Sequence, residues 1–369
     1  MSAKSRLRFI LTSLVIFSTY LTGLVPTRSA LAVDGLPGSP MFGYGARLDL
    51  QGQGIRQSVD LAAGMNFTWL LVEFDWAFYW PDPTSQPKWD QLDAVSALAH
   101  ENNINLVISL FNPPAWATTV HGPDPEHTAT LVLKLARRYP DIVLAVELFP
   151  GANTVAGWSA QPNPQDFNIL LQIVSTNLRS KAINVQMIAT LSPLSPDNTV
   201  TDVPDKDFLE GLYAYGWQAD NIILGIKYDK ITGDALQPPS PGGFPVLRHY
   251  EDLRNILIPH HDEQRLIWVT GFSWPVELTG NPDLAMGQAG WLFQAYRLLT
   301  AQLYIGAAFF EQINPNSASG VTSSLLQPDA TLHPACSLLS QLTNSTNIIV
   351  PEPFEKYLVL PYIIKGISK

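Results

Sequence analysis

The sequence is poor in cysteine, in charge and in basic residues. Its 369 residues include one cysteine, Cys336, so an intramolecular disulfide framework is excluded and the fold must depend on its own core. Only 15% of the residues are charged, 46% are hydrophobic and ten are tryptophan, which excludes a disordered chain. Acidic residues outnumber basic ones by 32 to 22, so no nucleic-acid partner is expected, because an acidic surface repels phosphate.

The sequence also lacks the motifs of several enzyme classes. It has no glycine-rich phosphate loop, no Gly-x-Ser-x-Gly nucleophile elbow and no His-Glu-x-x-His zinc helix. The run His260-His261-Asp262-Glu263 has metal-ligating residue types, but adjacent histidines in a polar turn point in different directions. Surface solvation explains this run better, and we expect neither a metal nor a cofactor.

The first 32 residues have the three parts of a secretory signal peptide. Lys4, Arg6 and Arg8 precede an apolar run from Phe9 to Val25, and Ala30-Leu31-Ala32 forms a small-residue cleavage site. We therefore expect residues 1–32 to be removed and the mature chain, with a formal net charge of −14, to be secreted or displayed at the cell surface. An uncleaved membrane anchor is the alternative, because the apolar run approaches spanning length.

Beyond this leader, apolar strand-like runs alternate with helical patterns. The expected strands are Met41–Leu48, Phe67–Phe74, Ile104–Leu110, Ile142–Phe149, Asn184–Thr190, Asn221–Lys227, Arg265–Phe272 and Tyr304–Phe310. The expected helices include Trp89–Glu101, Glu126–Arg138, Asp166–Lys181, Asp205–Tyr215 and Pro282–Leu303. Alternation of this kind indicates a parallel sheet covered by helices on its outer face. Eight strand–helix units predict a single α/β domain, a (β/α)8 TIM barrel over residues 33–343.

Two segments stand apart from the repeating units. The Pro/Gly run Gln237–Gly243 follows the sixth predicted strand and is expected to be a loop at the barrel mouth. Residues 344–369 are expected to be a C-terminal tail, which is too short and polar for a membrane span and is either a surface strand or a sorting signal. We therefore expect no membrane span in the mature chain.

The ends of the predicted strands are rich in aromatic residues. Active sites of TIM barrels are built at the C-terminal ends of the strands, so residues there are candidates for ligand binding. The candidates are Trp76, Trp80, Trp116, Asn153, Trp158, Tyr228 and Trp274. Aromatic faces stack on the apolar faces of sugar rings, so an oligo- or polysaccharide is the expected partner. The alternative is that several of these side chains are core residues that cap the barrel.

Five segments resemble one enzyme family in order and spacing. They are "FTWLLVEFDWAFYWPDPTSQPKWDQLDAVSALAHENNINLVISLFNPPAWA", "VELFPGANTVAGWSAQPNPQDFNILL", "DNIILGIKYD", "LIWVTGFSW" and "LLQPDATLHPACSLL". They are similar to the strand ends and helix starts of the (β/α)8 glycoside hydrolases of clan A. This resemblance covers nearly all of residues 41 to 343 and implies a TIM barrel that acts on carbohydrate.

The resemblance fails at the two catalytic positions. The family's acid/base glutamate falls on Gly151, and its nucleophile falls on Gly271. Retaining hydrolysis needs one carboxylic acid to protonate the leaving oxygen and a second carboxylate about 5–5.5 Å away to attack the anomeric carbon. Glycine supplies neither group, so the resemblance implies a barrel without its usual catalytic residues.

Other carboxylates near the strand ends are fallback candidates. Glu311 follows the eighth predicted strand, Glu73 and Asp75 end the second, and Glu277 lies six residues past Gly271. Glu147, on the same strand as Gly151, is expected to be a buried polar group paired within the barrel, because a buried carboxylate needs hydrogen-bond partners.

Two functional hypotheses follow from these residues. The first is an exported, catalytically inactive barrel that binds carbohydrate through an aromatic cleft. The second is an active glycosidase with relocated carboxylates. A barrel kept only as a scaffold, with contacts made by the tail, is a further alternative.

Expression of the full chain in a secreting host is expected to release a protein that begins at or near Val33. Intact mass and N-terminal sequencing of the culture medium measure this directly. A protein that stays in the membrane fraction with its first 32 residues attached would support the anchor instead.

Overall fold

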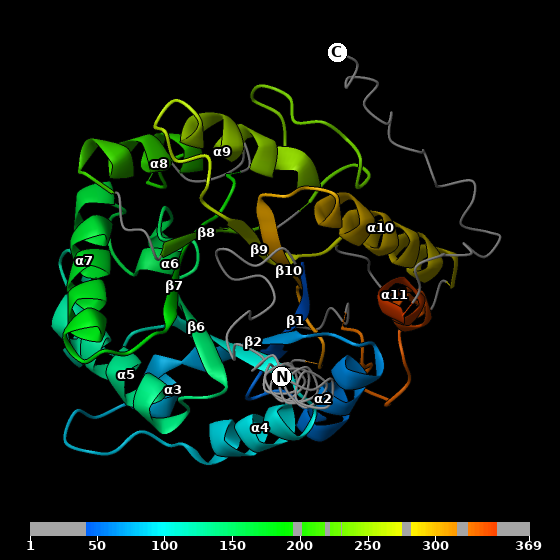
Figure 1. Ribbon diagram of the computed structural model, residues 1–369, viewed down its shortest axis with the longest axis horizontal. Helices are drawn as coiled ribbons and strands as arrows, with labels where there is room; N and C mark the ends of the chain where they lie inside the picture. Colours follow the sequence, from blue (N-terminus) through cyan, green and yellow to red (C-terminus); the bar gives the residue numbers. More distant parts are fainter. Residues whose placement is uncertain are drawn as a thin grey trace, which may run out of the picture. The chain divides into compact units, whose positions relative to one another are not determined.

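The barrel strands form a closed parallel sheet (Figure 1). The computed structural model describes residues 42–194, 201–217, 222–229, 231–274, 282–315 and 324–344. The strands are β1 (Gly43–Asp49), β2 (Trp69–Asp75), β3 (Asn105–Phe111), β6 (Val143–Leu148), β7 (Gln186–Leu191), β8 (Ile222–Lys227), β9 (Ile267–Phe272) and β10 (Ile305–Phe310). Each strand pairs with the next in this series and β10 pairs with β1. The predicted (β/α)8 fold is therefore confirmed, with strand ends that differ from the prediction by two residues at most.

Helices surround this sheet on its outer side (Figure 1). The longer ones are α2 (Ile55–Gly64), α4 (Asp90–Glu101), α5 (Pro125–Arg138), α7 (Pro164–Ser180), α8 (Asp205–Ala214), α9 (Tyr250–Leu257), α10 (Pro282–Thr300) and α11 (Ala335–Asn344). Short elements in the connections are α3 (Trp76–Tyr79), η1 (Ala115–Ala117), the hairpin β4 (Thr118–Thr119) with β5 (Gly122–Pro123), α6 (Val155–Trp158) and η2 (Leu247–His249). The sequence analysis did not single out α2, α9 or α11, and α11 ends where the predicted tail begins.

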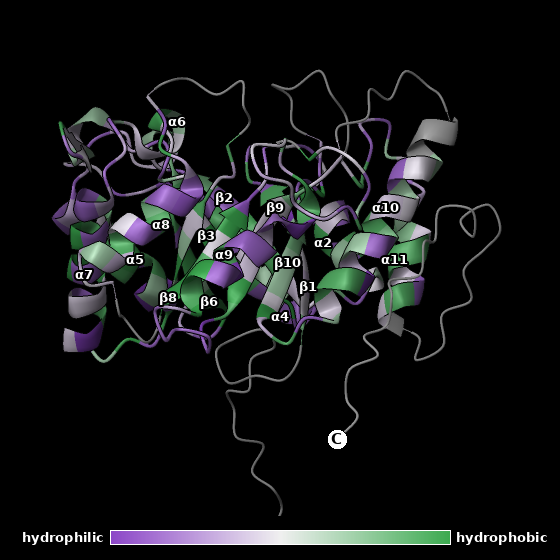
Figure 2. Cartoon of the chain, turned by 90° about the horizontal axis from the view of Figure 1, so that it is seen from above, coloured by the Kyte–Doolittle hydropathy of each residue, from purple (hydrophilic) through white to green (hydrophobic). Residues whose placement is uncertain are grey.

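Local sequence explains where several helices start. The Asp124 carboxylate accepts hydrogen bonds from the backbone N–H groups of Glu126 and His127, and a proline follows it at the first position of α5. Asn163 caps α7 in the same way. Side chains of these types satisfy N–H groups that have no partner within the helix, and proline there loses no helical hydrogen bond. The apolar faces of the helices then pack on the strands, which are hydrophobic along most of their length (Figure 2).

The barrel interior is packed separately from this helix–sheet core. Trp69 and Trp268 meet edge to face with ring centroids 5.1 Å apart, and Phe309 packs on Trp268 at 5.9 Å. These rings fill the lower part of the barrel because the neighbouring strand β1 has glycine there. A Cβ atom at Gly43 would lie 2.6 Å from the Trp69 ring, and one at Gly45 would lie 2.6 Å from the Phe309 ring. The interior is thus a packed core, as expected for a TIM barrel.

The connections that follow the strands lie together at one end of the barrel. They include α3 after β2 and α6 after β6, and α6 lies at the upper edge in Figure 2. This end is the barrel mouth, where the sequence-predicted site residues are found. Glu277 and residues 1–32 and 345–369 lie outside the described residues. Within the described residues, no helix combines the length and the hydropathy needed to cross a bilayer.

Replacing Gly225 by alanine is expected to destabilise the barrel by about 1–3 kcal/mol, the usual cost of overpacking a core. A Cβ atom at this position in β8 would overlap the hydroxyl of Thr190 and come within 2.8 Å of Ile188. The Thr190 hydroxyl donates a hydrogen bond to buried Glu147 at 2.7 Å, so its displacement also leaves a carboxylate oxygen unpaired. Urea unfolding of the two proteins measures the change.

The control is Gly64→Ala at the exposed end of α2, where a Cβ atom meets nothing within 4 Å. This substitution is expected to be neutral or slightly stabilising, because alanine favours a helix over glycine. Equal stability of the Gly225→Ala and Gly64→Ala proteins would contradict the packing described for the barrel interior.

Candidate functional site

Polar side chains replace apolar ones at the mouth end of the barrel interior. They come from the ends of all eight strands. The members are Arg47 of β1, Glu73 of β2, Ser109 of β3, Glu147 of β6, Thr190 of β7, Lys227 of β8, Thr270 of β9, and Glu311 just after β10. We call this set the mouth cluster. Because these strand ends converge in the barrel, charges that are far apart in the sequence contact one another here.

Arg47 is at the centre of the mouth cluster. Its guanidinium is 2% exposed and donates to Glu73 Oε1 at 2.7 Å, to Glu147 Oε2 at 3.4 Å and to the carbonyl oxygen of Thr270 at 2.9 Å. Glu311 Oε2 lies 4.0 Å from Arg47 Nε. Burial acts to lower the pKa of Arg47, but the three glutamates outweigh it and raise that pKa above its ordinary value. The site therefore contains a fixed positive charge.

Glu147 is the interior polar group that the sequence predicted. Its side chain is fully buried and accepts hydrogen bonds from Ser109 Oγ at 2.5 Å and Thr190 Oγ1 at 2.7 Å, in addition to its ion pair with Arg47. Both carboxylate oxygens thus have donors, which is what a buried charge requires. A carboxylate enclosed in this way is held by the barrel and has no exposed surface for a substrate.

The sequence resemblance matches Gly271 to the family's nucleophile, and a side chain there would displace the carboxylate of Glu311. A Cβ atom would overlap Glu311 Oε2 and would lie 3.1 Å from Lys227 Cγ and 3.3 Å from Arg47 Cδ. The pairing of β8 with β9 shifts register immediately before this residue. The carboxylate of Glu311 and the stem of Arg47 therefore fill the space that a nucleophile side chain would need.

Gly151, which the sequence resemblance matches to the family's acid/base residue, is required by the backbone. Its φ is +78°, in the left-handed region that favours glycine, and its N–H donates to the Thr190 carbonyl at 3.1 Å. A Cβ atom there would also lie 2.9 Å from Ser192 Oγ. A glutamate at this position would strain the turn after β6, so the two glycines are kept by different constraints.

Glu311 is the fallback carboxylate with the most unusual surroundings. It is 28% exposed, yet its Oε2 atom is buried and has no hydrogen-bond partner among the described residues. Its Oε1 atom lies 3.4 Å from Lys227 Nζ, which also pairs with Asp229 at 3.1 Å. Burial raises the pKa of Glu311 above its ordinary value, although Lys227 and Arg47 act in the opposite direction. The same carboxylate holds the pKa of Lys227 above its ordinary value against the effect of burial.

A second carboxylate lies close to Glu311. Glu73 Oε1 is 3.2 Å and Glu311 Oε2 is 4.0 Å from the same atom, Arg47 Nε, so the two oxygens are separated by no more than the sum of these distances. Carboxyl separations in glycoside hydrolases are about 5–9.5 Å. The other described fallback residue, Asp75, caps α3 through Phe78 N–H at 3.0 Å and accepts from Asn112 at 2.9 Å, so it fixes the loop after β2.

The structure buries six of the seven residues that the sequence predicted to bind ligand. The exposed fraction is at most 6% for each of Trp76, Trp80, Asn153, Trp158, Tyr228 and Trp274. Trp116 alone is half-buried. Its indole N–H donates to the Pro81 carbonyl at 3.1 Å and its ring packs edge to face on Trp76 and Trp80. A sugar ring needs an exposed aromatic surface, and Trp116 is the member of this set whose side chain is partly exposed.

The buried residues of this predicted ligand-binding set hold loops at the mouth together through hydrogen bonds. The indole N–H of Trp158 donates to the His121 carbonyl at 2.9 Å, and that of Trp274 donates to the Gly233 carbonyl at 2.8 Å. The Tyr228 hydroxyl donates to the Leu247 carbonyl at 2.5 Å. Each bond joins two segments that the sequence separates, so these side chains give the mouth its shape.

The run of histidine and acidic residues before β9 has partners of its own. His260 stacks on Tyr213 with centroids 4.0 Å apart and pairs with Glu210 at 2.7 Å, while the Asp262 carboxylate accepts from Arg265 and Tyr213. Among the described residues, no group of three or more His, Cys, Asp or Glu side chains is placed to hold a metal ion.

Several solved glycoside hydrolases have a similar fold. A family 39 glycoside hydrolase from Bacteroides cellulosilyticus matches with a TM-score of 0.60 at 15% identity, over 82% of this chain and 64% of that chain. A family 30 subfamily 8 xylanase from Clostridium acetobutylicum has a TM-score of 0.54 at 14% identity, over 82% of this chain and 70% of that one. An endo-β-1,4-glucanase from Xanthomonas axonopodis pv. citri has a TM-score of 0.57 at 12% identity, over 82% of this chain and 99% of that one.

No protein-family model matches the sequence, and no curated protein matches it either. At identities of 15% or less, the likeness to solved structures shows the fold. The chain therefore has the barrel of the glycoside hydrolases that its sequence resembles, and what it does must be argued from its own residues.

Sequence reasoning missed the two cations of the mouth cluster. Arg47 is the one charged residue within the first predicted strand, and Lys227 ends the sixth. A lone charge in an otherwise buried strand is a signal that it has a partner, because an unpaired buried charge is strongly destabilising. The sequence therefore indicates that Arg47 has a charged partner, but it does not show which carboxylates pair with Arg47 and Lys227.

Replacing Glu311 by glutamine is expected to change how stability depends on pH. Because burial raises the pKa of Glu311 in the folded protein, its contribution to stability is fully present below its unfolded pKa, about 4.3 for glutamate, and is lost as pH rises through the folded pKa. The variant lacks this titration. The free energy of unfolding of the wild type minus that of the variant is therefore expected to fall as pH rises from about 4.

Urea unfolding at a series of pH values measures this difference. The control is Glu101→Gln, at the exposed end of α4. If the free energy of unfolding of the wild type minus that of Glu311→Gln grew with rising pH, the ion pairs of Glu311 would outweigh the effect of burial on its pKa, which would contradict this prediction.

Proposed function

We propose that this protein is an exported glycoside-hydrolase-like barrel that binds an oligo- or polysaccharide and does not hydrolyse it. The fold supports a carbohydrate partner, since the similar structures include a xylanase, an endo-β-1,4-glucanase and an exo-β-1,4-mannosidase. The leader in residues 1–32 supports export to where such polymers are found.

The glycine at position 271 carries the proposal of inactivity. A nucleophilic carboxylate must approach the anomeric carbon from a side chain at the mouth, and glycine supplies none, while the Glu311 carboxylate lies where such a side chain would begin. The backbone at Gly151 disfavours any side chain for the second role. Both positions are thus adapted to the mouth cluster and not to hydrolysis.

The charges of the mouth cluster also disfavour hydrolysis. Glu73 and Glu311 are its partly exposed carboxylates, and each is held by a cation at short range. Glu73 Oε1 accepts hydrogen bonds from both Nε and Nη2 of Arg47, so a substrate would have to compete with the guanidinium for this oxygen. Binding needs no such group, and the partly open face of Trp116 supplies an apolar surface for a sugar ring.

Hydrolysis by a relocated pair is the second candidate function. One observation favours it: Glu311 has a raised pKa, as a general acid needs, and Glu73 lies near it on the other side of Arg47 Nε. In this scheme Glu311 protonates the leaving oxygen and Glu73 acts as base or nucleophile. Loss of either carboxylate would then abolish turnover.

Measuring both oligosaccharide binding and oligosaccharide hydrolysis distinguishes a binding protein from an active glycosidase. We expect calorimetry of the purified chain from Val33 onward to show binding of β-1,4-linked gluco-, xylo- or manno-oligosaccharides, with no release of reducing ends or aryl aglycones. Trp116→Ala is expected to weaken binding about 3- to 10-fold, which corresponds to the loss of one aromatic contact. The control is Tyr215→Ala, an exposed aromatic residue just after α8 at the opposite end of the barrel.

Turnover that disappears in Glu311→Gln would overturn the proposal and support the relocated pair. Binding that is equally weak in the Trp116→Ala and Tyr215→Ala proteins would place the sugar away from Trp116.

A further inference from the structure

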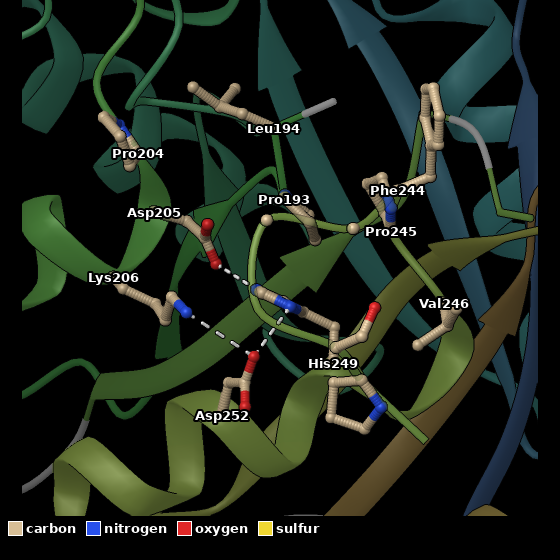
Figure 3. Close-up of a pocket in the computed structure, with 14 residues that line it drawn as sticks. Pro193, Leu194, Pro204, Asp205, Lys206, Phe244, Pro245, Val246, His249 and Asp252 are labelled. Carbon is tan, nitrogen blue, oxygen red and sulfur yellow. Dashed lines mark hydrogen bonds and ion pairs between the residues drawn. The ribbon is translucent and has the colours of Figure 1, made fainter. Parts of the chain in front are cut away.

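A cavity of about 300 Å³ lies at the rim of the mouth, apart from the mouth cluster (Figure 3). Its walls come from two connections: the one between β7 and α8 and the one between β8 and α9. The lining residues that bear on its chemistry are Pro193, Pro204, Lys206, Phe244, His249 and Asp252. None of them belongs to the mouth cluster, so this cavity is a separate site. Its volume lies at the lower end of the range for small-molecule pockets.

One side of the cavity is apolar and rigid. Prolines from both connections line it, and the Phe244 ring is 45% exposed beside them. Proline has little conformational freedom to lose on binding, and an exposed aromatic ring offers a flat face. The predicted mouth loop Gln237–Gly243 contributes to this wall.

The other side is a chain of paired charges. Asp205 and Asp252 flank the His249 ring, with Oδ2 atoms 2.6 Å from Nε2 and 3.4 Å from Nδ1 respectively. Lys206 Nζ lies 3.6 Å from the same Asp252 oxygen. Figure 3 shows this chain from Asp205 through His249 and Asp252 to Lys206. Asp205 and His249 are nearly buried, whereas Asp252 and Lys206 keep exposed donor and acceptor atoms.

Buried side chains hold the two walls in place. Asn153 donates from Nδ2 to the Ser192 and Val203 carbonyls, both at 2.9 Å, and accepts from the Ser192 N–H at 2.8 Å, which fixes the wall after β7. The wall after β8 is fixed by the Tyr228 hydroxyl on the Leu247 carbonyl and by the Thr232 N–H on the Pro245 carbonyl at 2.9 Å. The cavity is therefore largely preformed, which lowers the entropy cost of binding.

The balance of charge selects the kind of ligand. Lys206 is already paired with Asp252, and His249 contacts both Asp205 and Asp252, so an anion or a cation gains little from entering. A neutral saccharide has apolar ring faces and hydroxyl groups, which suit the two sides of the cavity. We propose that this rim cavity binds a neutral oligosaccharide, with one pyranose unit stacked on Phe244 and hydroxyl groups hydrogen-bonded by Asp252 and Lys206. The proposal rests on the proposed function, because it assumes a carbohydrate ligand.

Titration calorimetry with β-1,4-linked oligosaccharides of one to six units tests this site. Phe244→Ala is expected to raise the Kd of the best ligand about 10-fold, and Lys206→Met about 3-fold, since one loses the stacking face and the other a hydrogen-bond donor. The control is Tyr215→Ala, which removes an aromatic ring of similar exposure, 49%, far from the cavity. Circular dichroism melting confirms that each variant is folded.

The Trp116→Ala protein separates failure of this site from failure of the proposed function. Binding that is weakened by Trp116→Ala but unchanged by Phe244→Ala and Lys206→Met overturns the rim site and leaves the proposed function standing. A wild-type protein that binds none of the oligosaccharides overturns both. Weaker binding in the two rim variants than in the control supports the rim site.

Discussion

The structure at the barrel mouth depends on one buried positive charge. The Arg47 guanidinium is removed from water, and a charge in that position is tolerated only when opposite charges and hydrogen-bond acceptors surround it. Glu73, Glu147 and Glu311 supply the charges and the Thr270 carbonyl supplies a further acceptor. These partners come from β2, β6, β9 and the end of β10, so closure of the barrel is also what compensates the charge. Removing Arg47 would leave the Glu147 carboxylate buried without its opposite charge.

The same arrangement limits what the mouth can do chemically. Gly271 leaves space that the Glu311 carboxylate occupies, so a side chain at that position would displace Glu311 from its place beside Arg47 and Lys227. Gly151 holds a left-handed turn that a side chain would strain. Carboxylates that neutralise a cation stabilise the barrel but are less available to a substrate. The open surface suited to a ligand consequently lies away from the barrel axis, at Trp116 and at the rim around Phe244.

The secondary structure was predictable because it rests on local patterns. Runs such as Tyr304–Phe310 are apolar on both faces, as strands of a buried parallel sheet are, and the intervening helices repeat at three and four residues. Exposure of individual side chains was not predictable in this way. Trp158 and Tyr228 follow strand ends as ligand-binding residues do, yet each donates a hydrogen bond to a backbone carbonyl of another segment and is buried. Nothing local to either residue specifies that partner.

The sequence by itself determined the barrel, the order of its strands and the presence of glycine at positions 151 and 271. These properties depend on hydrophobic periodicity and on residue identity, both of which are local. Only the tertiary structure decided that Arg47 meets Glu311 from the opposite end of the chain, and that Asn153 and Tyr228 hold the walls of a rim cavity. The physical reason is that closure of β10 on β1 and the crossing of loops at the mouth set these distances, and no sequence spacing encodes them.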